Sequence, residues 1–240
     1  MADFSSAIAA VRDSVCGILR VRPVQPAVTP PQFQVGFVGS GWCISSKRYI
    51  ATAHHIFDSG NPRNPVDKFF AFVVPGNGSL AYHAPVVAVP FDDPTIDMAI
   101  LEISAPASYQ LSTAPVTFAR PRDGAEVVTY GFPAPTIASA QVDQDGNWAG
   151  GNLLLKAHAN EGIVAAQYDF GPHYSYELNV GWHHGESGGP IFSLEPHAVF
   201  AMMQFYRNIQ SPHGTVAGPH MGRAVSLMAS ALTAYGAVIV

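Results

Sequence analysis

The chain has 240 residues, of which 48% are hydrophobic and 12% are charged. This balance favours a compact globular protein, because disorder requires lower hydrophobicity and denser charge. The formal net charge of −5 provides no electrostatic basis for binding nucleic acid or an anionic membrane surface. No apolar run is long enough to span a bilayer. We therefore expect a globular protein that binds neither nucleic acid nor membranes.

The N-terminus and the cysteines predict the cellular compartment. The opening residues, MADFSSAIAAVRDSV, lack the basic start and long apolar core of a secretory signal, so we expect a cytoplasmic protein. Cys16 and Cys43 are the only cysteines, and two buried thiols are favoured over a disulfide. The ten histidines are scattered without the spacing of a zinc site, so we predict no metal ion and no cofactor.

The first half of the chain is predicted to form a helix followed by strands. Phe4, Ile8 and Val11 share one face of a short helix over residues 3–14. Short apolar or β-branched runs divided by turn residues then predict six strands. These runs cover residues 15–23, 33–45, 49–57, 68–75, 84–91 and 97–104.

The second half repeats this pattern after a connector at residues 105–124. Seven further strand-like runs follow, at residues 126–132, 152–159, 162–170, 175–182, 189–194, 198–206 and 221–227. The Ala- and Leu-rich end predicts a C-terminal helix closed by Gly236. Two groups of strands without alternating long helices indicate two antiparallel barrels or sandwiches.

The segment GWHHGESGGPIF, residues 181–192, sets Ser187 among several glycines. Glycine and proline are common in any surface turn, but they also suit a backbone bent to expose a nucleophilic serine. A serine nucleophile needs a base and a group that orients the base. YIATAHHIF ends with His54 and His55, and TIDMAILEI places Asp97 at the start of an apolar run. The order His, Asp, Ser is one in which such triads occur.

These segments resemble the chymotrypsin-like (trypsin-like) serine proteases. TAHH, DMAIL and GESGGP are similar to that family's histidine, aspartate and serine boxes. GSGWCISSKRYIATAHHIF, DGAEVVTYGFP and MGRAVS look nearest its bacterial Deg-type and glutamyl-endopeptidase branches. The resemblance spans residues 14–236 and implies an all-β protein of two six-stranded antiparallel β-barrels, with the active site between them. The expected division is a helix at 1–13, one barrel at 14–108, and a second barrel with the C-terminal helix at 109–240.

The resemblance assigns a role to each residue of the triad. Ser187 is expected to attack the scissile carbonyl, His55 to carry the proton, and Asp97 to orient the imidazole. The backbone N–H groups of Gly185 and Ser187 are expected to form the oxyanion hole. In the family box, two residues stand between the threonine and the base, so Thr52 selects His55 over His54.

Three departures from the family pattern affect these expectations. Glu186 replaces an Asp or Asn beside the serine, and the chain opens with Met1 rather than Ile-Val. We therefore expect activity without proteolytic maturation, and a Glu186 side chain that points away from the cleft. Gln204 stands where the family has a Ser or Thr that supports the catalytic aspartate.

The family positions also imply a substrate pocket. Its expected residues are Gly181, Trp182, His183, Met203, Gln204 and Phe205. No acidic residue stands at the pocket base, and Arg223 is expected to be solvated, so we predict an uncharged residue before the scissile bond. The expected partners are a protein or peptide substrate and a regulatory protein. The alternative to an active serine endopeptidase is a catalytically silent chymotrypsin-fold binding or scaffold protein.

Overall fold

The structure is a computed structural model that describes most of the chain. The described residues are 3–24, 29–46, 48–58, 65–74, 81–106, 111–171, 173–181, 183–211 and 214–240, without the side chains of 206–211 and 215–217.

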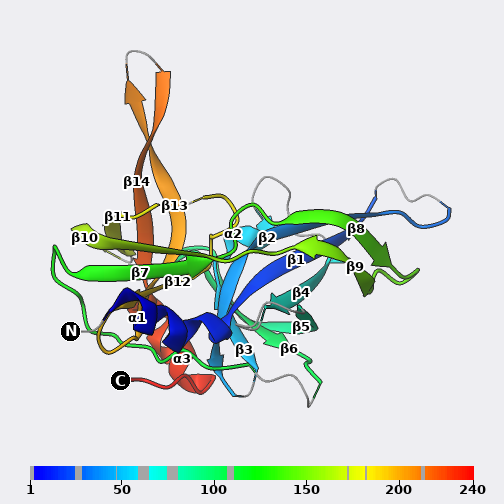
Figure 1. The fold of residues 1–240 in the computed structure, drawn as a ribbon, viewed down its shortest axis with the longest axis horizontal. Coiled ribbons are helices and arrows are strands. Elements are labelled where there is room, and N and C mark those ends of the chain that lie inside the picture. Colours follow the sequence, from blue (N-terminus) through cyan, green and yellow to red (C-terminus); the bar gives the residue numbers. More distant parts are fainter. Residues whose placement is uncertain are drawn as a thin grey trace.

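Six antiparallel strands close the first barrel in the order β1-β2-β3-β6-β5-β4 (Figure 1). They are β1 (Val15–Pro23), β2 (Phe33–Ser45), β3 (Tyr49–Thr52), β4 (Lys68–Val73), β5 (Tyr82–Asp93) and β6 (Met98–Ile103). A single helical turn, α2 (His55–Asp58), follows β3. Most residues of β1, β3, β4 and β6 are buried, and most of these buried residues are hydrophobic. The interior of the first barrel is therefore apolar.

Six more strands close a second barrel in the order β10-β11-β14-β13-β12-β7. They are β7 (Glu126–Gly131), β10 (His158–Phe170), β11 (His173–Asn179), β12 (Pro190–Ser193), β13 (Val199–Ser211) and β14 (Gly214–Ala224). Strands β13 and β14 stay paired as far as Ser211 and Gly214, and Figure 1 shows them projecting beyond the barrel. The predicted fold of two six-stranded antiparallel barrels is confirmed. The domain boundaries at residues 13 and 108 stay a prediction.

The sequence did not predict a two-stranded sheet outside both barrels. It consists of β8 (Thr136–Val142) and β9 (Trp148–Leu154). The run at 152–159 predicts one strand, whereas β9 ends at Leu154 and β10 begins at His158. Trp148 meets Phe72 of the first barrel edge to face, with ring centroids 5.4 Å apart. This hairpin, which follows β7 in the chain, therefore covers part of the first barrel.

Helices at both ends of the chain confirm two predictions. Helix α1 (Phe4–Val11) begins after Asp3, whose carboxylate accepts the backbone N–H of Ser6 as an N-cap. The last turn η2 (Val225–Met228) leads into α3 (Ala229–Ala234), and Gly236 follows with a positive φ of 81°. No helix in the described ranges is long and apolar enough to cross a membrane.

Candidate active site

His55 and Asp97 meet because the strands that carry them are paired. Strand β3 ends at Thr52 and pairs with the start of β6 at Ala99, so the residues just outside both strands are neighbours. Asp97 Oδ2 lies 2.9 Å from His55 Nδ1, and Asp97 Oδ1 accepts the backbone N–H of His55 at 2.8 Å. The carboxylate therefore fixes both the ring and the backbone of this histidine.

Asp97 has a left-handed backbone conformation that neighbouring groups help to maintain. Its φ is 56°, a region that Asp enters more readily than most residues with a side chain. Gln204 Nε2 donates to the backbone carbonyls of Asp97 and Ile96, at 3.0 and 3.2 Å. The backbone N–H of His54 also donates to the Asp97 carbonyl, at 3.3 Å.

His54 has an acidic partner of its own, which sequence reasoning missed. Its Nδ1 lies 2.5 Å from Oδ1 of Asp92, the residue of β5 that pairs with Ala99. Asp92 stands shortly before Pro94, a pattern that indicates only a turn, so nothing in the sequence signalled this contact. The two adjacent histidines thus hold different carboxylates, and only His55 contacts Asp97 through its ring.

The loop that carries Ser187 is attached to the first barrel through Ser40 of β2. The Ser40 backbone N–H donates to the Ser187 carbonyl at 2.8 Å. Its hydroxyl donates to the Gly185 carbonyl at 2.8 Å and accepts the Phe132 N–H at 3.0 Å. Ser40 is fully buried. Sequence reasoning gave Ser40 no role; the GSG segment around it was the one available signal.

Gly188 lets this loop pack directly on the strand end that precedes the histidines. A side chain there would collide with the Ser40 carbonyl and the Thr52 hydroxyl and lie 2.9 Å from the Ala53 nitrogen. Its φ of 84° also favours glycine. Gly188 therefore packs against the end of β3, and the half-buried Ser187 precedes it in the chain. Its hydroxyl donates to the Gln204 carbonyl at 3.2 Å, and no Ser187–His55 hydrogen bond occurs among the described residues.

Two backbone N–H groups beside Ser187 are free to bind an oxygen atom. The His184 carbonyl accepts the Ala134 N–H at 2.9 Å, and a trans peptide points the Gly185 N–H the opposite way. Gly185 has a φ of 101°, and a Cβ there would lie 2.6 Å from the Phe132 carbonyl oxygen. Within the described part of the chain, the N–H groups of Gly185 and Ser187 donate no hydrogen bond. Backbone N–H groups without an internal partner can stabilise an oxyanion when they face the same point.

Glu186 anchors the same loop from inside the second barrel. Its side chain is fully buried, and its Oε2 accepts the His183 N–H at 2.6 Å. Asn160 of β10 donates to Oε1 at 3.4 Å. Burial raises the pKa of Glu186 to about 7, although the hydrogen bonds from His183 and Asn160 oppose this increase. The expectation that Glu186 points away from the cleft agrees with this burial.

Arg223 was expected to be solvated, and this expectation is wrong. Its side chain is 9% exposed, because β14 lies between β11 and β13 and Arg223 pairs with residues of both strands. Its Nε donates to Gln204 Oε1 at 3.0 Å, and a terminal nitrogen contacts His173 Nδ1. Burial lowers the pKa of Arg223, and the negative charge of Asp97 opposes this decrease.

The predicted pocket residues on β13 face different surroundings. Met203 is 2% exposed and packs against Gly189, whereas Phe205 is 44% exposed. The Gln204 side chain is directed at the backbone carbonyl of Asp97. Its contact with Ser187 is therefore made by the backbone carbonyl oxygen of Gln204.

The remaining predicted pocket residues lie before the Ser187 loop. Gly181 and His183 are exposed, and Trp182 lies outside the described residues. His183 also meets His158 edge to face, with ring centroids 6.4 Å apart.

Neither cysteines nor acidic clusters contribute to this site. Cys16 and Cys43 are free and buried, and burial raises the pKa of both thiols. Among the residues described, no group of three or more His, Cys, Asp or Glu side chains could hold a metal ion.

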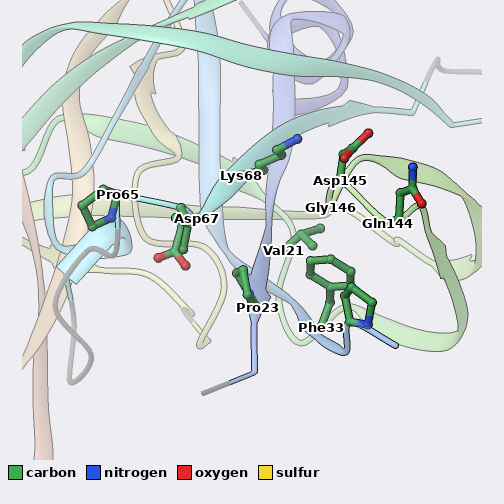
Figure 2. Close-up of a pocket in the computed structure, with 11 residues that line it drawn as sticks. Val21, Pro23, Phe33, Pro65, Asp67, Lys68, Gln144, Asp145 and Gly146 are labelled. Carbon is green, nitrogen blue, oxygen red and sulfur yellow. The ribbon is translucent and has the colours of Figure 1, made fainter. Parts of the chain in front are cut away.

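A cleft of about 400 Å³ lies at the start of β2, among residues other than those of the predicted site (Figure 2). Its walls come from β1, from β4 with the segment before it, and from the turn that joins β8 to β9. They include Val21, Phe33, Pro65, Lys68 and Asp145.

Comparisons with known proteins agree with this fold. No curated protein sequence matches the chain. A solved structure of the HtrA-type protease AlgW with a decapeptide is 14% identical, with a TM-score of 0.67 over 97% of this chain and 67% of that chain. The MamO protease domain from Magnetospirillum magneticum, in its apo form, is 16% identical, with a TM-score of 0.57 over 92% of this chain and 97% of that chain. At these identities the two likenesses show the fold alone.

Family membership rests on a separate match. The family described as trypsin-like peptidase domain matches residues 39–202, which include Ser40, His55, Asp97 and Ser187. Because this match covers more than half of the sequence, the chain belongs to the trypsin-like peptidase domain family and is a serine endopeptidase by family.

Proposed function

We propose that this protein hydrolyses peptide bonds with Ser187 as nucleophile, His55 as general base and Asp97 as the group that orients His55. The observation that carries the proposal is the paired contact of Asp97 with the ring and backbone of His55, next to a loop with two free N–H donors. This arrangement joins a base, its orienting carboxylate and an oxyanion-binding loop, which are the parts that acyl transfer requires.

The reaction follows from these positions. Ser187 Oγ attacks the scissile carbonyl while its proton passes to His55 Nε2, and the N–H groups of Gly185 and Ser187 bind the resulting oxyanion. His55 then donates the proton to the leaving amine, which leaves an acyl group on Ser187. A water molecule, deprotonated by His55, hydrolyses this ester and restores the enzyme. The Ser187 hydroxyl must first leave the Gln204 carbonyl, by rotation about its Cα–Cβ bond.

The proposed substrate is a peptide or unfolded protein segment. The AlgW structure contains a decapeptide, which supports this class of substrate for a protein of the same fold. We propose an uncharged residue before the scissile bond, because an unpaired buried ion costs several kcal/mol. Arg223 is buried and bonded to Gln204, which supports this preference by leaving an anionic side chain without that partner. A cytoplasmic location and a regulatory partner stay predictions.

Reactivity with a fluorophosphonate probe tests the proposed nucleophile. Wild-type protein should be labelled once, and peptide mapping should place the adduct on Ser187. The Ser187→Ala variant should not be labelled, whereas Ser193→Ala, a matched change of a β12 serine, should react like wild type. An adduct at another residue, or equal labelling of Ser187→Ala, would show that the nucleophile is misassigned. A properly folded wild-type protein that is never labelled would favour the silent scaffold.

A further inference from the structure

The amide of Gln204 lies between two kinds of partner that allow it one orientation. On one side are the backbone carbonyls of Ile96 and Asp97, which can only accept hydrogen bonds. On the other side is Arg223 Nε–H, which can only donate one. If the amide were rotated by half a turn, its oxygen would face two carbonyl oxygens and its nitrogen would face a donor. Arg223 therefore fixes which end of Gln204 faces Asp97.

Arg223 is itself held in place from several directions. Its β14 backbone pairs with Ser175 of β11 and Met202 of β13, and the ring of His173 contacts its terminal nitrogen. Because the whole Arg223 residue is only 9% exposed, its side chain has little freedom to turn toward solvent. A rigid donor at this position keeps the Gln204 amide from rotating.

The contacts from Arg223 through Gln204 end at the backbone carbonyl oxygen of Asp97. Asp97 has a left-handed backbone, and its carbonyl is the acceptor that Gln204 binds at 3.0 Å. Since the Asp97 carboxylate contacts His55 twice, a shift of this backbone would move the carboxylate away from the His55 ring.

We propose that Arg223 is a positioning residue that acts through Gln204 to hold Asp97 in the conformation that orients His55. This inference rests on the proposed triad. Arg223 and Gln204 together form a support for Asp97: Arg223 binds Gln204, and Gln204 binds the Asp97 backbone carbonyl. Both residues are buried, and their side chains are directed at the Asp97 backbone and at each other, so we expect the support to affect turnover more than binding.

Four variants test the proposal. Arg223→Met keeps the aliphatic length but removes the donor, and Gln204→Met removes the amide. Arg223→Lys keeps a cationic donor without the planar fork, so it covers the case in which Arg223→Met does not fold. Arg122→Met, a change of an exposed arginine that precedes β7, is the matched control. Circular dichroism and urea denaturation should first show that each variant is folded.

Two readouts separate positioning from a merely structural role. The first is the rate of fluorophosphonate labelling together with kcat and KM on a cleaved peptide. We expect Arg223→Met and Gln204→Met each to lower the labelling rate and kcat about tenfold or more, with KM little changed. The double variant should lose no more than the worse single variant, because both act through one contact. Arg223→Lys should recover part of the loss, and Arg122→Met should match wild type.

The second readout does not require activity. The proton on His55 Nδ1, hydrogen-bonded to Asp97, should give a downfield proton NMR signal that is absent from His55→Ala. This signal should weaken or move upfield in folded Arg223→Met, Arg223→Lys or Gln204→Met. If it is unchanged in all three and labelling rates equal wild type, Arg223 does not position Asp97. If wild type gives the signal but no labelling, the proposed function fails while the support is still tested.

Discussion

Replacing Glu186 by Gln should stabilise the protein at neutral and alkaline pH. The carboxyl is fully buried, and its pKa is raised from an ordinary value of 4.5 to about 7. Gln has nearly the same shape and carries no charge. Its oxygen can still accept the His183 N–H, and its NH₂ can bond to Asn160 after the Asn160 amide rotates.

The sign of the effect follows from proton linkage. Because the folded state binds the Glu186 proton more tightly than the unfolded chain, the stability contributed by this group is full below pH 4.5. It is lost as the pH rises toward 7, where the buried carboxyl ionises. A difference between 4.5 and about 7 corresponds to about 3 kcal/mol. For a chain of this size that is roughly 6–12 °C in Tm.

Urea denaturation of wild type and Glu186→Gln between pH 4.5 and 8 measures this contribution. Between pH 4.5 and 8, the free energy of unfolding of the variant should rise by about 3 kcal/mol relative to that of wild type. Most of this rise should occur between pH 5 and 7. Subtracting the wild-type free energy of unfolding from that of Glu186→Gln at each pH removes the contributions of other titrating groups. Glu161→Gln, an exposed change on β10, is the control and should follow wild type. Parallel stability curves for wild type and Glu186→Gln would refute the argument that Glu186 ionises at a cost inside the fold.

Four further substitutions probe the site. Ser40→Ala should lower the free energy of unfolding by about 2 kcal/mol in urea denaturation, because the Gly185 carbonyl loses its partner inside the protein; an unchanged value would contradict this. Gly185→Ala should slow fluorophosphonate labelling at least about 100-fold, since the new Cβ would displace the oxyanion loop; wild-type rates would argue against that hole. His55→Ala should reduce peptide hydrolysis on the order of 10⁴–10⁶-fold and His54→Ala less than about tenfold; a reversed order would make His54 the base.

The parts of the fold that the sequence predicted are those with a local signature. Strand β6 is a short apolar run bounded by turns and was found where predicted. The run predicted as a strand over residues 49–57 forms β3 only as far as Thr52, and its end forms the helical turn α2. The terminal helix ends at Ala234, shortly before Gly236, because the chain there needs a positive φ, which glycine supplies at low cost. His55 and Asp97 were singled out by boxes at strand ends, and the pairing of β3 with β6 brings them together.

The parts that the sequence did not predict depend on distant neighbours. Strand β8 is mostly exposed and lacks an apolar face, so its run of small and polar residues carried no strand signal. Arg223 is buried by strands on both sides, which an arginine in a short run cannot reveal. The role of Ser40 arises from contacts with Phe132 and Gly185, which are 92 and 145 residues away in the chain.

The two halves of the site are each held by the opposite barrel. Ser40 of the first barrel binds the carbonyls of Gly185 and Ser187, whose loop belongs to the second barrel. Gln204 of the second barrel binds the carbonyl of Asp97, which precedes a strand of the first. These contacts fix the backbones of the proposed nucleophile and of the proposed orienting acid, although no Ser187–His55 hydrogen bond occurs within the described ranges. Because the backbone position is set independently of the serine rotamer, the proposed mechanism requires only that Ser187 release the Gln204 backbone carbonyl and turn toward His55, while the proposed oxyanion donors stay in place.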